Sequence, residues 1–214
     1  MTDTAPTDIA PTGTALCDLW FDPVCPYTWI TSRWLLEAAR VRPIEVRWHL
    51  LSLAALNEGK EEDPEGDTEG FLWLPARVAT AVDLEHGQEA LGRFYTAFGE
   101  RIHRGDWDED TFADALADAD LPRGLAEAAG SEELDDRVRA STFEGVDLVG
   151  RHVGSPIVAV TPPGGERVAF FGPVLSRIPR GEEAGRLWDG APLVAGVRGF
   201  NKIEGPPPGA PDFS

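Results

Sequence analysis

The stretch DPVCPYTW, residues 22–29, holds the side chains with the clearest chemical potential in this chain. Cys25 precedes a proline, and proline is favoured at the first position of an α-helix. A cysteine at such a junction faces free backbone N–H groups and the positive end of the helix dipole, which favour thiolate over thiol. The sequence therefore predicts a reactive nucleophile with a lowered pKa at Cys25.

Thr28 stands three residues after Cys25, where a dithiol redox centre would carry its second cysteine. A thiol there would resolve a mixed disulfide from within the chain, and threonine cannot. Two interpretations stay open: Thr28 is an ordinary first-turn residue, or its hydroxyl donates a hydrogen bond to the Cys25 thiolate. The other cysteine, Cys17, is expected inside a buried strand, too far from Cys25 along an extended chain for a disulfide.

A second proline also belongs to the candidate chemistry. Ser155-Pro156 opens a predicted strand, and the residues alone leave the isomer of that peptide bond open. The four histidines, at positions 49, 86, 103 and 152, show no metal-ligand spacing, so we expect no metal site. A Gly-rich phosphate loop and a nicotinamide fingerprint are also missing, and no flavin site is evident. Reducing equivalents are therefore expected to arrive through thiols or another protein.

Hydrophobic periodicity predicts the elements that would hold these residues. Strands are predicted over residues 16–21, 44–50, 156–161 and 167–171. Helices are predicted over residues 26–40, 70–85, 88–104, 110–119, 122–129, 131–149 and 181–189. Asp110 and Ser131 are expected to cap two of these helices, and Gly190 is expected to end the last one.

The order is strand, helix, strand, helical block, strand, strand, helix, and a right-handed crossover would make the first two strands parallel. This is the order of an α/β thioredoxin fold with an all-helical insertion. The expected division is a disordered tail (1–14), a thioredoxin-like domain (15–57 and 150–200), a helical insertion domain (58–149) and an extended C-terminal tail (201–214). The segment 58–69 is expected to be a charged, solvated linker.

Composition excludes some classes of partner. The formal net charge of −18 disfavours nucleic acid and anionic membrane surfaces. No apolar run is long enough to span a bilayer, and the first residues lack the pattern of a signal peptide. We therefore expect a cytoplasmic protein whose two cysteines stay reduced.

Four stretches point to a family. The longest, WFDPVCPYTWITSRWLLEAARVRPIEVRWHLLSLAALNE, resembles the active-site region of the cytoplasmic DsbA-like oxidoreductases, and in particular the mycothiol-dependent nitroreductases. The stretches GERIH (99–103), VGSPIVAV (153–160) and FFGPVLSRIPRGEEAG (170–185) are similar to the same family. The resemblance implies a thioredoxin fold with a helical insertion, related in architecture to the kappa-class glutathione transferases.

The resemblance also implies roles for single residues. It makes Cys25 the nucleophile and Pro156 a cis-proline, and it places Tyr27 and His103 in the cleft. Mycothiol, a low-molecular-weight thiol, is the implied reductant, and nitro-aromatic compounds are implied substrates. We expect the neighbouring residues of both motifs to complete the binding surface: Pro26, Trp29 and Ser155. The family pattern is Cys-Pro-aromatic-Cys, so Thr28 departs from it and excludes a self-contained dithiol–disulfide cycle.

Three functions remain in competition. The first is a monothiol oxidoreductase in which an external thiol resolves a mixed disulfide at Cys25. The second is a transferase or isomerase in which Thr28 activates the sulfur of a bound thiol cofactor. The third is a small-ligand-binding protein with a vestigial redox site. Expected partners are a low-molecular-weight thiol and a small-molecule substrate, with a mycoredoxin-type protein and a second copy of the chain as further candidates.

Overall fold

The computed structural model describes residues 13–61, 63–105, 107–206 and 209–214. Most of the predicted N-terminal tail, residues 1–12, lies outside this range. The strands form one four-stranded sheet in the order β2-β1-β3-β4, with β1 parallel to β2 and the other pairs antiparallel. Their bounds are β1 (Ala15–Phe21), β2 (Ile44–Leu50), β3 (Ile157–Thr161) and β4 (Val168–Phe171). All four strands were predicted to within one residue at each end.

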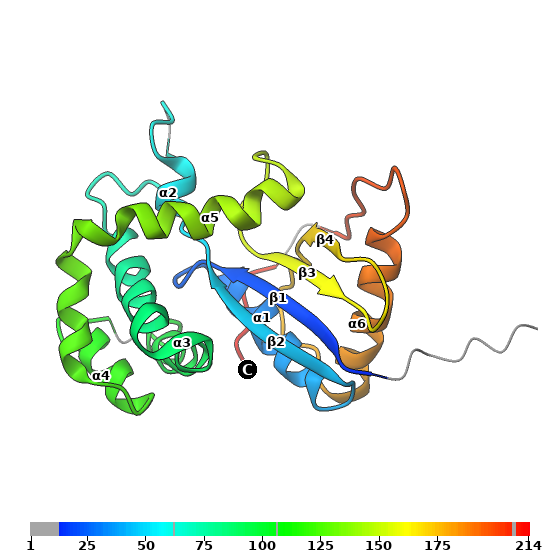
Figure 1. The fold of residues 1–214 in the computed structure, drawn as a ribbon, viewed down its shortest axis with the longest axis horizontal. Helices are drawn as coiled ribbons and strands as arrows, with labels where there is room; N and C mark the ends of the chain where they lie inside the picture. Colours follow the sequence, from blue (N-terminus) through cyan, green and yellow to red (C-terminus); the bar gives the residue numbers. More distant parts are fainter. Residues whose placement is uncertain (1–12, 62, 106, 207–208) are drawn as a thin grey trace, which may run out of the picture.

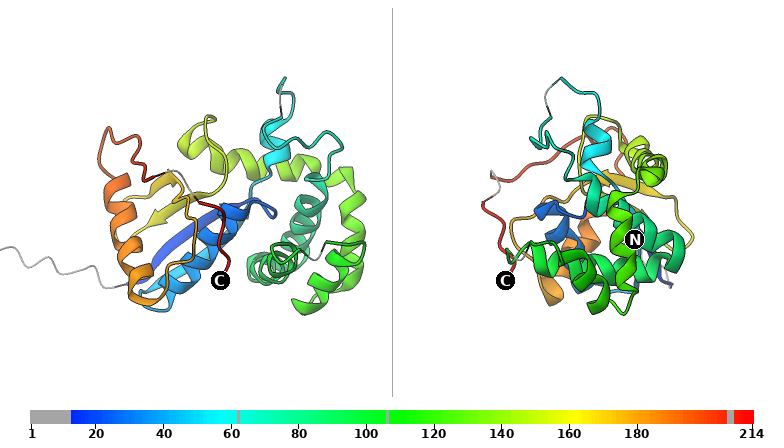
Figure 2. Two further views of the ribbon diagram at one scale, coloured as in Figure 1. Left: turned by 180° about the vertical axis from the view of Figure 1, so that it is seen from behind. Right: turned by 90° about the vertical axis from the view of Figure 1, so that its left-hand side faces the viewer.

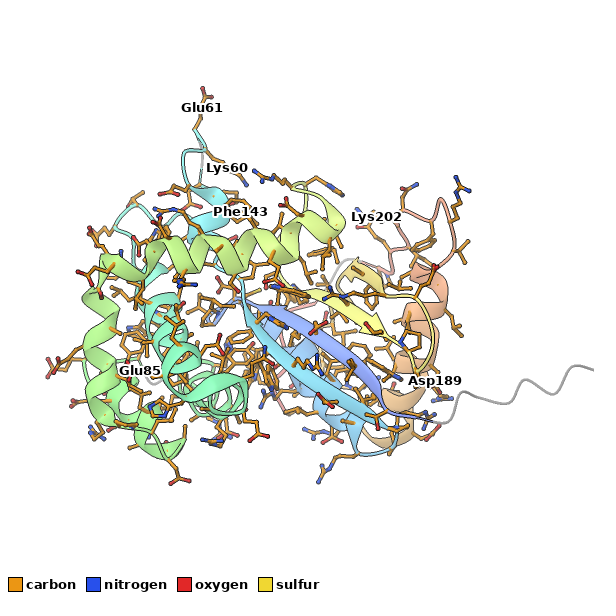
Figure 3. All side chains as sticks on the ribbon, viewed as in Figure 1. Lys60, Glu61, Glu85, Phe143, Asp189 and Lys202 are labelled. Carbon is orange, nitrogen blue, oxygen red and sulfur yellow. The ribbon has the colours of Figure 1, made fainter. Side chains whose placement is uncertain are left out.

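The helices follow in the chain order expected, and much of the helical block lies to one side of the sheet (Figure 1). Their bounds are α1 (Pro26–Ala39), α2 (Leu53–Asn57), α3 (Trp73–Ile102), α4 (Thr111–Asp118), α5 (Asp135–Val149) and α6 (Gly181–Ala195). Two 3-10 helices, η1 (Arg123–Gly130) and η2 (Glu132–Leu134), lead into α5. Outside these elements, Lys60 and Glu61 project from the charged loop after α2 (Figure 3).

The break expected between the helices at 70–85 and 88–104 is present inside α3, at Gly87, where φ is 78° and ψ is 178°. Two other helical predictions need correction. The segment expected as an α-helix over 122–129 is the 3-10 helix η1, in which Gly124 lowers the α-helical propensity. The segment 131–149 becomes α-helical only from Asp135, and the short helix α2 was missed.

The last helix also differs from its prediction at its C-terminal end. Gly190 lies inside α6, which continues to Ala195. A glycine ends a helix when it takes a positive φ, and Gly190 does not. Asp110 and Ser131 precede helices as predicted, although neither side chain makes a capping hydrogen bond. The proposed domain boundaries stay a prediction.

Strand β1 is buried on both faces, as its nearly continuous apolar run indicates. Leu19 and Phe21 belong to the same core cluster as Trp34 of α1, whose indole N–H donates to the Ala184 carbonyl of α6 at 3.0 Å. Trp20 points to the opposite face, where α5 covers the sheet (Figure 2). The sheet therefore lies between α1 with α6 on one side and α5 on the other.

Helix α3 joins the helical region to the sheet through one face. Gly92, Tyr95 and Gly99 follow one another at spacings of three and four, so they share that face. The Tyr95 ring stacks on Phe21 with ring centroids 3.9 Å apart. A Cβ atom at Gly92 or Gly99 would lie under 3.0 Å from the ring of Trp48 or Trp29, respectively. The absence of a side chain at these glycines therefore lets α3 approach β2 and α1 closely.

Candidate active site

Cys25 is the N-cap residue of α1, directly before Pro26 at the first helical position. Its carbonyl accepts the first helical hydrogen bond, from Trp29 N–H at 3.0 Å. The chain reaches this point through a turn after β1 in which Cys25 N–H donates to the Asp22 carboxylate at 3.1 Å. The structure thus places the thiol at the junction that the sequence predicted, between the end of a buried strand and a helix N-terminus.

Thr28 and Ser155 form the polar contacts beside this thiol. Their hydroxyl oxygens lie 2.6 Å apart, and Ser155 Oγ also accepts a hydrogen bond from Asp22 N–H at 3.1 Å. The Cys25 thiol can donate to the Ser155 carbonyl, with the sulfur 3.9 Å from that oxygen. Thr28 is fully buried, so its hydroxyl serves the interior of the site and not the solvent. When Ser155 donates to Thr28, the Thr28 hydrogen is left free for a Cys25 thiolate.

The peptide bond between Ser155 and Pro156 is cis. This isomer is the one that the family resemblance implied. The cis bond lies at the start of β3, beside the end of β1. Ser155 and Pro156 therefore lie next to the first turn of α1, although they belong to the second half of the sequence. A second cis bond, between Gly172 and Pro173, follows β4, and the Pro173 carbonyl accepts from the Thr31 hydroxyl at 2.7 Å.

Asp22 lies next to Cys25, although it is not among the site residues predicted from the sequence. The residue is 1% exposed. Its carboxylate accepts three backbone N–H bonds, from Val24, Cys25 and Leu53, at 2.8 to 3.1 Å. Burial nevertheless raises the pKa of Asp22 to about 6. An aspartate that follows a strand and precedes Pro23 is typical of a turn that its own side chain stabilises, and this signal could have marked it.

The pKa of Cys25 contradicts the sequence-based expectation. Burial raises this pKa above the ordinary thiol value, and the nearby Asp22 carboxylate raises it further. The Thr28 hydroxyl and the backbone N–H groups of Thr28 and Tyr27 act in the opposite direction but do not outweigh burial. The helix N-terminus does favour the thiolate, as expected, but a residue only 9% exposed loses more from the removal of water.

The predicted aromatic residues lie on two sides of α1. Tyr27 packs against the cluster that contains Cys25 and Leu51, whereas Trp29 belongs to the larger core cluster. Positions two apart on a helix point in nearly opposite directions, so Tyr27 and Trp29 do not form one wall. Both residues were predicted to line the binding surface, and the structure places them on different sides of the helix.

His103 reaches this region from the C-terminal end of α3. Its ring lies 5.3 Å from the Trp29 ring and stacks on Phe213 at 4.8 Å. Burial lowers the pKa of His103 to about 4, and the positive charge of Arg33 acts in the same direction, so the imidazole is neutral at pH 7. Among the described residues, His103 Nε2 has no hydrogen-bond partner. His103 thus lies beside Trp29, and Trp29 is one helical turn after Cys25 in α1.

The structure thus separates the predicted residues into two adjoining sets. The first surrounds the sulfur and contains Cys25, Thr28, Ser155 and Pro156. The second contains Trp29 and His103, which line a cavity of about 460 Å³ beside α1. Pro26 and Tyr27 lie in the helical turn that starts at Cys25.

Comparison with known proteins gives the family. The model of the Rv2466c-like family, described as mycothiol-dependent nitroreductase Rv2466c, matches residues 24–204. The chain belongs to this family. A member of the mycothiol-dependent nitroreductase family is a thiol-dependent oxidoreductase enzyme, which agrees with a cysteine at the N-terminus of α1. The family also indicates a low-molecular-weight thiol as partner.

One relative and two solved structures are also similar to this chain. The uncharacterized protein Rv2286c of Mycobacterium tuberculosis is 28% identical over 192 residues, which cover 87% of this nitroreductase-family chain and 78% of the relative. A candidate protein disulfide isomerase from Nitrosomonas europaea superposes with a TM-score of 0.54 at 15% identity, over 83% of this chain and 97% of that one. Pseudomonas aeruginosa DsbA2 gives a TM-score of 0.53 at 14% identity, over 75% and 81%. These two likenesses confirm the predicted fold class, a DsbA-like thioredoxin fold with a helical insertion.

Two negative findings concern metals and membranes. Within the described ranges, no group of three or more His, Cys, Asp or Glu side chains is arranged to hold a metal ion. In that same part of the chain, no helix combines the length and the apolar character needed to cross a bilayer.

Proposed function

We propose that this chain is a monothiol oxidoreductase in which Cys25 is the nucleophile and an external thiol resolves its mixed disulfide. The observation that carries the proposal is Cys25 at the N-cap of α1 with Thr28, a hydroxyl, one helical turn on. Cys17 is fully buried, and burial raises its pKa far above the ordinary thiol range. Cys17 is therefore unsuited to resolve the mixed disulfide, and the second sulfur comes from outside the chain.

The exchange at Cys25 proceeds in two balanced steps. The Cys25 thiolate attacks one sulfur of a disulfide R–S–S–R, which forms a Cys25–S–S–R bond and releases RS⁻. An external thiolate R′S⁻ then attacks the R sulfur, which yields R–S–S–R′ and restores the Cys25 thiolate. These two steps release one R thiolate and leave the other R group in the mixed disulfide R–S–S–R′. A second external thiolate then attacks the R′ sulfur of R–S–S–R′, which releases the second RS⁻ and forms R′–S–S–R′, so the substrate disulfide gains the two electrons that two external thiols lose.

The family name adds the reduction of nitro groups, and small nitro-aromatic compounds are the proposed substrates. Conversion of Ar–NO₂ to Ar–NO takes two electrons and two protons. Two thiols supply the electrons and the protons and are oxidised to one disulfide. The oxygen atom removed from the nitro group leaves as one water molecule. The proposed thiol is mycothiol, with a mycoredoxin-type protein or a second thiol to recycle it. The proposed compartment is the cytoplasm, because this chemistry needs a reducing environment.

Each residue near the sulfur has a role in this proposal. The Thr28 hydroxyl stabilises the Cys25 thiolate as it forms, and Ser155 orients Thr28 through the 2.6 Å contact. Pro156 and Ser155 shape the surface against which the thiol lies, since the Ser155 carbonyl is within 3.9 Å of the sulfur. Pro26, Tyr27, Trp29 and His103 are proposed to contact the thiol co-substrate or the substrate.

Mass spectrometry after incubation with oxidised mycothiol tests the proposal. The expected result is one mycothiol adduct per chain, located on Cys25, and loss of both adduct and nitroreductase turnover in Cys25→Ser. Cys17→Ala is the matched control, and it should keep the adduct and the turnover because Cys17 is buried in the core. No adduct on Cys25 in the folded protein would contradict the proposal.

The same variants separate the monothiol mechanism from a transferase mechanism. If Thr28 activated a bound cofactor sulfur, Cys25→Ser would spare turnover and Thr28→Val would abolish it. The monothiol mechanism predicts that Cys25→Ser abolishes turnover. Thr28→Val should only slow turnover, because the hydroxyl assists formation of the thiolate. The burial of Thr28 and its contact with Ser155 support the monothiol mechanism.

A further inference from the structure

A cavity of about 460 Å³ lies beside α1, one helical turn beyond Cys25. Its wall comes from four separate parts of the chain: α1, the end of α3, the loop before α6 and the C-terminal residues. Leu36, Ile178 and Phe213 contribute apolar surface. This volume is within the range of small-molecule sites, which are about 300–1,000 Å³.

The charge of this wall is opposite to the charge of the protein. Four arginines line the cavity, against two glutamates, in a chain of formal net charge −18. Glu37 is already paired, with Arg40 at 2.9 Å and with Arg180 at 3.8 Å. The cavity wall therefore carries positive charge that the protein's own carboxylates do not neutralise.

Arg33 is the least compensated of these cations. Its guanidinium lies over the Trp29 ring at 4.1 Å, and its Nε and Nη1 atoms donate to the hydroxyls of Ser32 and Thr96 at 3.1 and 3.0 Å. Among the described residues, no carboxylate lies within ion-pair distance of Arg33, and its buried Nη2 atom has no hydrogen-bond partner. Glu100, also in the wall, acts on Arg33 only through its more distant charge.

A buried cation without an anion is costly, because its lost hydration is not replaced. Burial accordingly lowers the pKa of Arg33 to about 10, whereas the ordinary value is above 12. Two of the guanidinium nitrogens donate to neutral hydroxyls, and the third, which is closed off from solvent, has no partner among the described residues. A carboxylate bound in the cavity beside this guanidinium supplies the missing negative charge.

We propose that this cavity binds a small organic carboxylate, with its anionic group at Arg33 and its apolar body against Leu36, Ile178 and Phe213. Cys25 is not in the cavity wall, but Trp29 of the wall lies one helical turn after it. The bound compound is assigned as a substrate of the same centre on the strength of this proximity. The inference therefore rests on the proposed function and narrows its substrate class to anionic compounds.

Benzoate and benzamide are the test probes, since they share a shape and differ in charge. Binding is measured by isothermal titration at constant ionic strength in the full chain carrying Cys25→Ser, without any thiol. We expect benzoate to bind about tenfold or more tightly than benzamide, as a charged hydrogen bond implies. Arg33→Gln in the same background should reduce this ratio to about two. Arg151→Gln, an exposed arginine outside the cavity, is the matched control and should keep the full ratio.

Equal affinity for benzoate and benzamide, or an unchanged ratio in Arg33→Gln, would overturn the inference. Inorganic phosphate that binds as tightly as benzoate would overturn the part played by the apolar wall. If Arg33→Gln does not fold, the Nε–H NMR signal of Arg33 in the Cys25→Ser chain decides: benzoate must shift it, and an unmoved signal contradicts the inference. Benzoate binding without a mycothiol adduct would defeat only the proposed function, and an adduct without benzoate binding would defeat only this inference.

Discussion

At the scale of single residues, Asp22 links the charge of the site to the stability of the fold. The carboxyl group is buried, and burial raises its pKa to about 6. Its ionised form also raises the pKa of the Cys25 thiol. One proton on Asp22 therefore affects both the folding free energy and the fraction of Cys25 that is thiolate.

The pH dependence of stability has a definite sign. In the unfolded chain Asp22 has a pKa near its usual ~3.9, so between about pH 4 and pH 6 the folded state holds the proton and the unfolded state releases it. Stability therefore falls as pH rises through this window, by about 3 kcal/mol from this group. Asp22→Asn should remove this loss of stability, which urea denaturation at a series of pH values from 4 to 7 measures. Asp136→Asn, on an exposed side chain, should keep it.

The same variant checks the link to the thiol. The amide introduced by Asp22→Asn carries no charge, so alkylation of Cys25 by iodoacetamide at pH 7 should be faster in this variant than in the parent. An unchanged alkylation rate, together with an unchanged pH profile of stability, would show that Asp22 acts on neither quantity.

At the scale of elements, the contact between α1 and α3 depends on a glycine. The face of α3 that contains Gly92, Tyr95 and Gly99 packs against the sheet and α1, and Gly99 lies against the Trp29 ring. The ring of Trp29 in turn supports Arg33 on its face and His103 at its side. The absence of one side chain in α3 thus positions three residues of the cavity.

Two glycine substitutions should have opposite effects. Gly99→Ala places a methyl group under 3.0 Å from the Trp29 ring and should destabilise the fold by about 1–3 kcal/mol. Gly190→Ala adds a methyl group inside α6 with nothing within 4 Å, and it should stabilise by about 0.5–1 kcal/mol because glycine costs entropy in a helix. The free energy of unfolding in urea measures both, and a loss of equal size at the two sites would contradict the packing argument.

At the scale of the whole molecule, the C-terminal residues return to the site. Asp212 N–H donates to the Ser176 carbonyl at 2.8 Å, and Phe213 stacks on His103. The predicted tail, residues 201–214, contains no helix or strand in its described part, as expected, but its last residues form a wall of the cavity. Residues 207–208 of this tail lie outside the described range.

The contact between Phe213 and His103 has a measurable consequence. Burial lowers the pKa of His103 to about 4, and Phe213 supplies part of that burial. Phe213→Ala should therefore raise the pKa toward the ordinary value near 6.5, as followed by NMR titration of the imidazole. Phe200→Ala, at an exposed position before the tail, is the control and should leave the pKa unchanged. A pKa still near 4 in Phe213→Ala would exclude Phe213 as a cause of the shift.

Much of the fold followed from local signals. A mixed apolar run predicted β1, strand-like periodicity predicted the other three strands, and Pro26 predicted that α1 begins directly after Cys25. Helix ends were less predictable where glycine could stay helical, as at Gly190. Local signals placed Cys25 at a helix start, whereas Pro156 and His103 came only from the family resemblance, because contacts between distant parts of the chain leave no local signal.

The sequence alone was enough to place a cysteine at a helix N-terminus without a second thiol, because proline placement and strand periodicity are local properties. Tertiary structure decided the rest. Asp22 becomes a buried acid only when Leu53 and Ser155, 31 and 133 residues away, close around it. The same enclosure reverses the expected shift of the Cys25 pKa, since desolvation depends on every element packed around the sulfur. CPYT therefore contains the proposed nucleophile, and the folded chain sets how readily its thiol ionises.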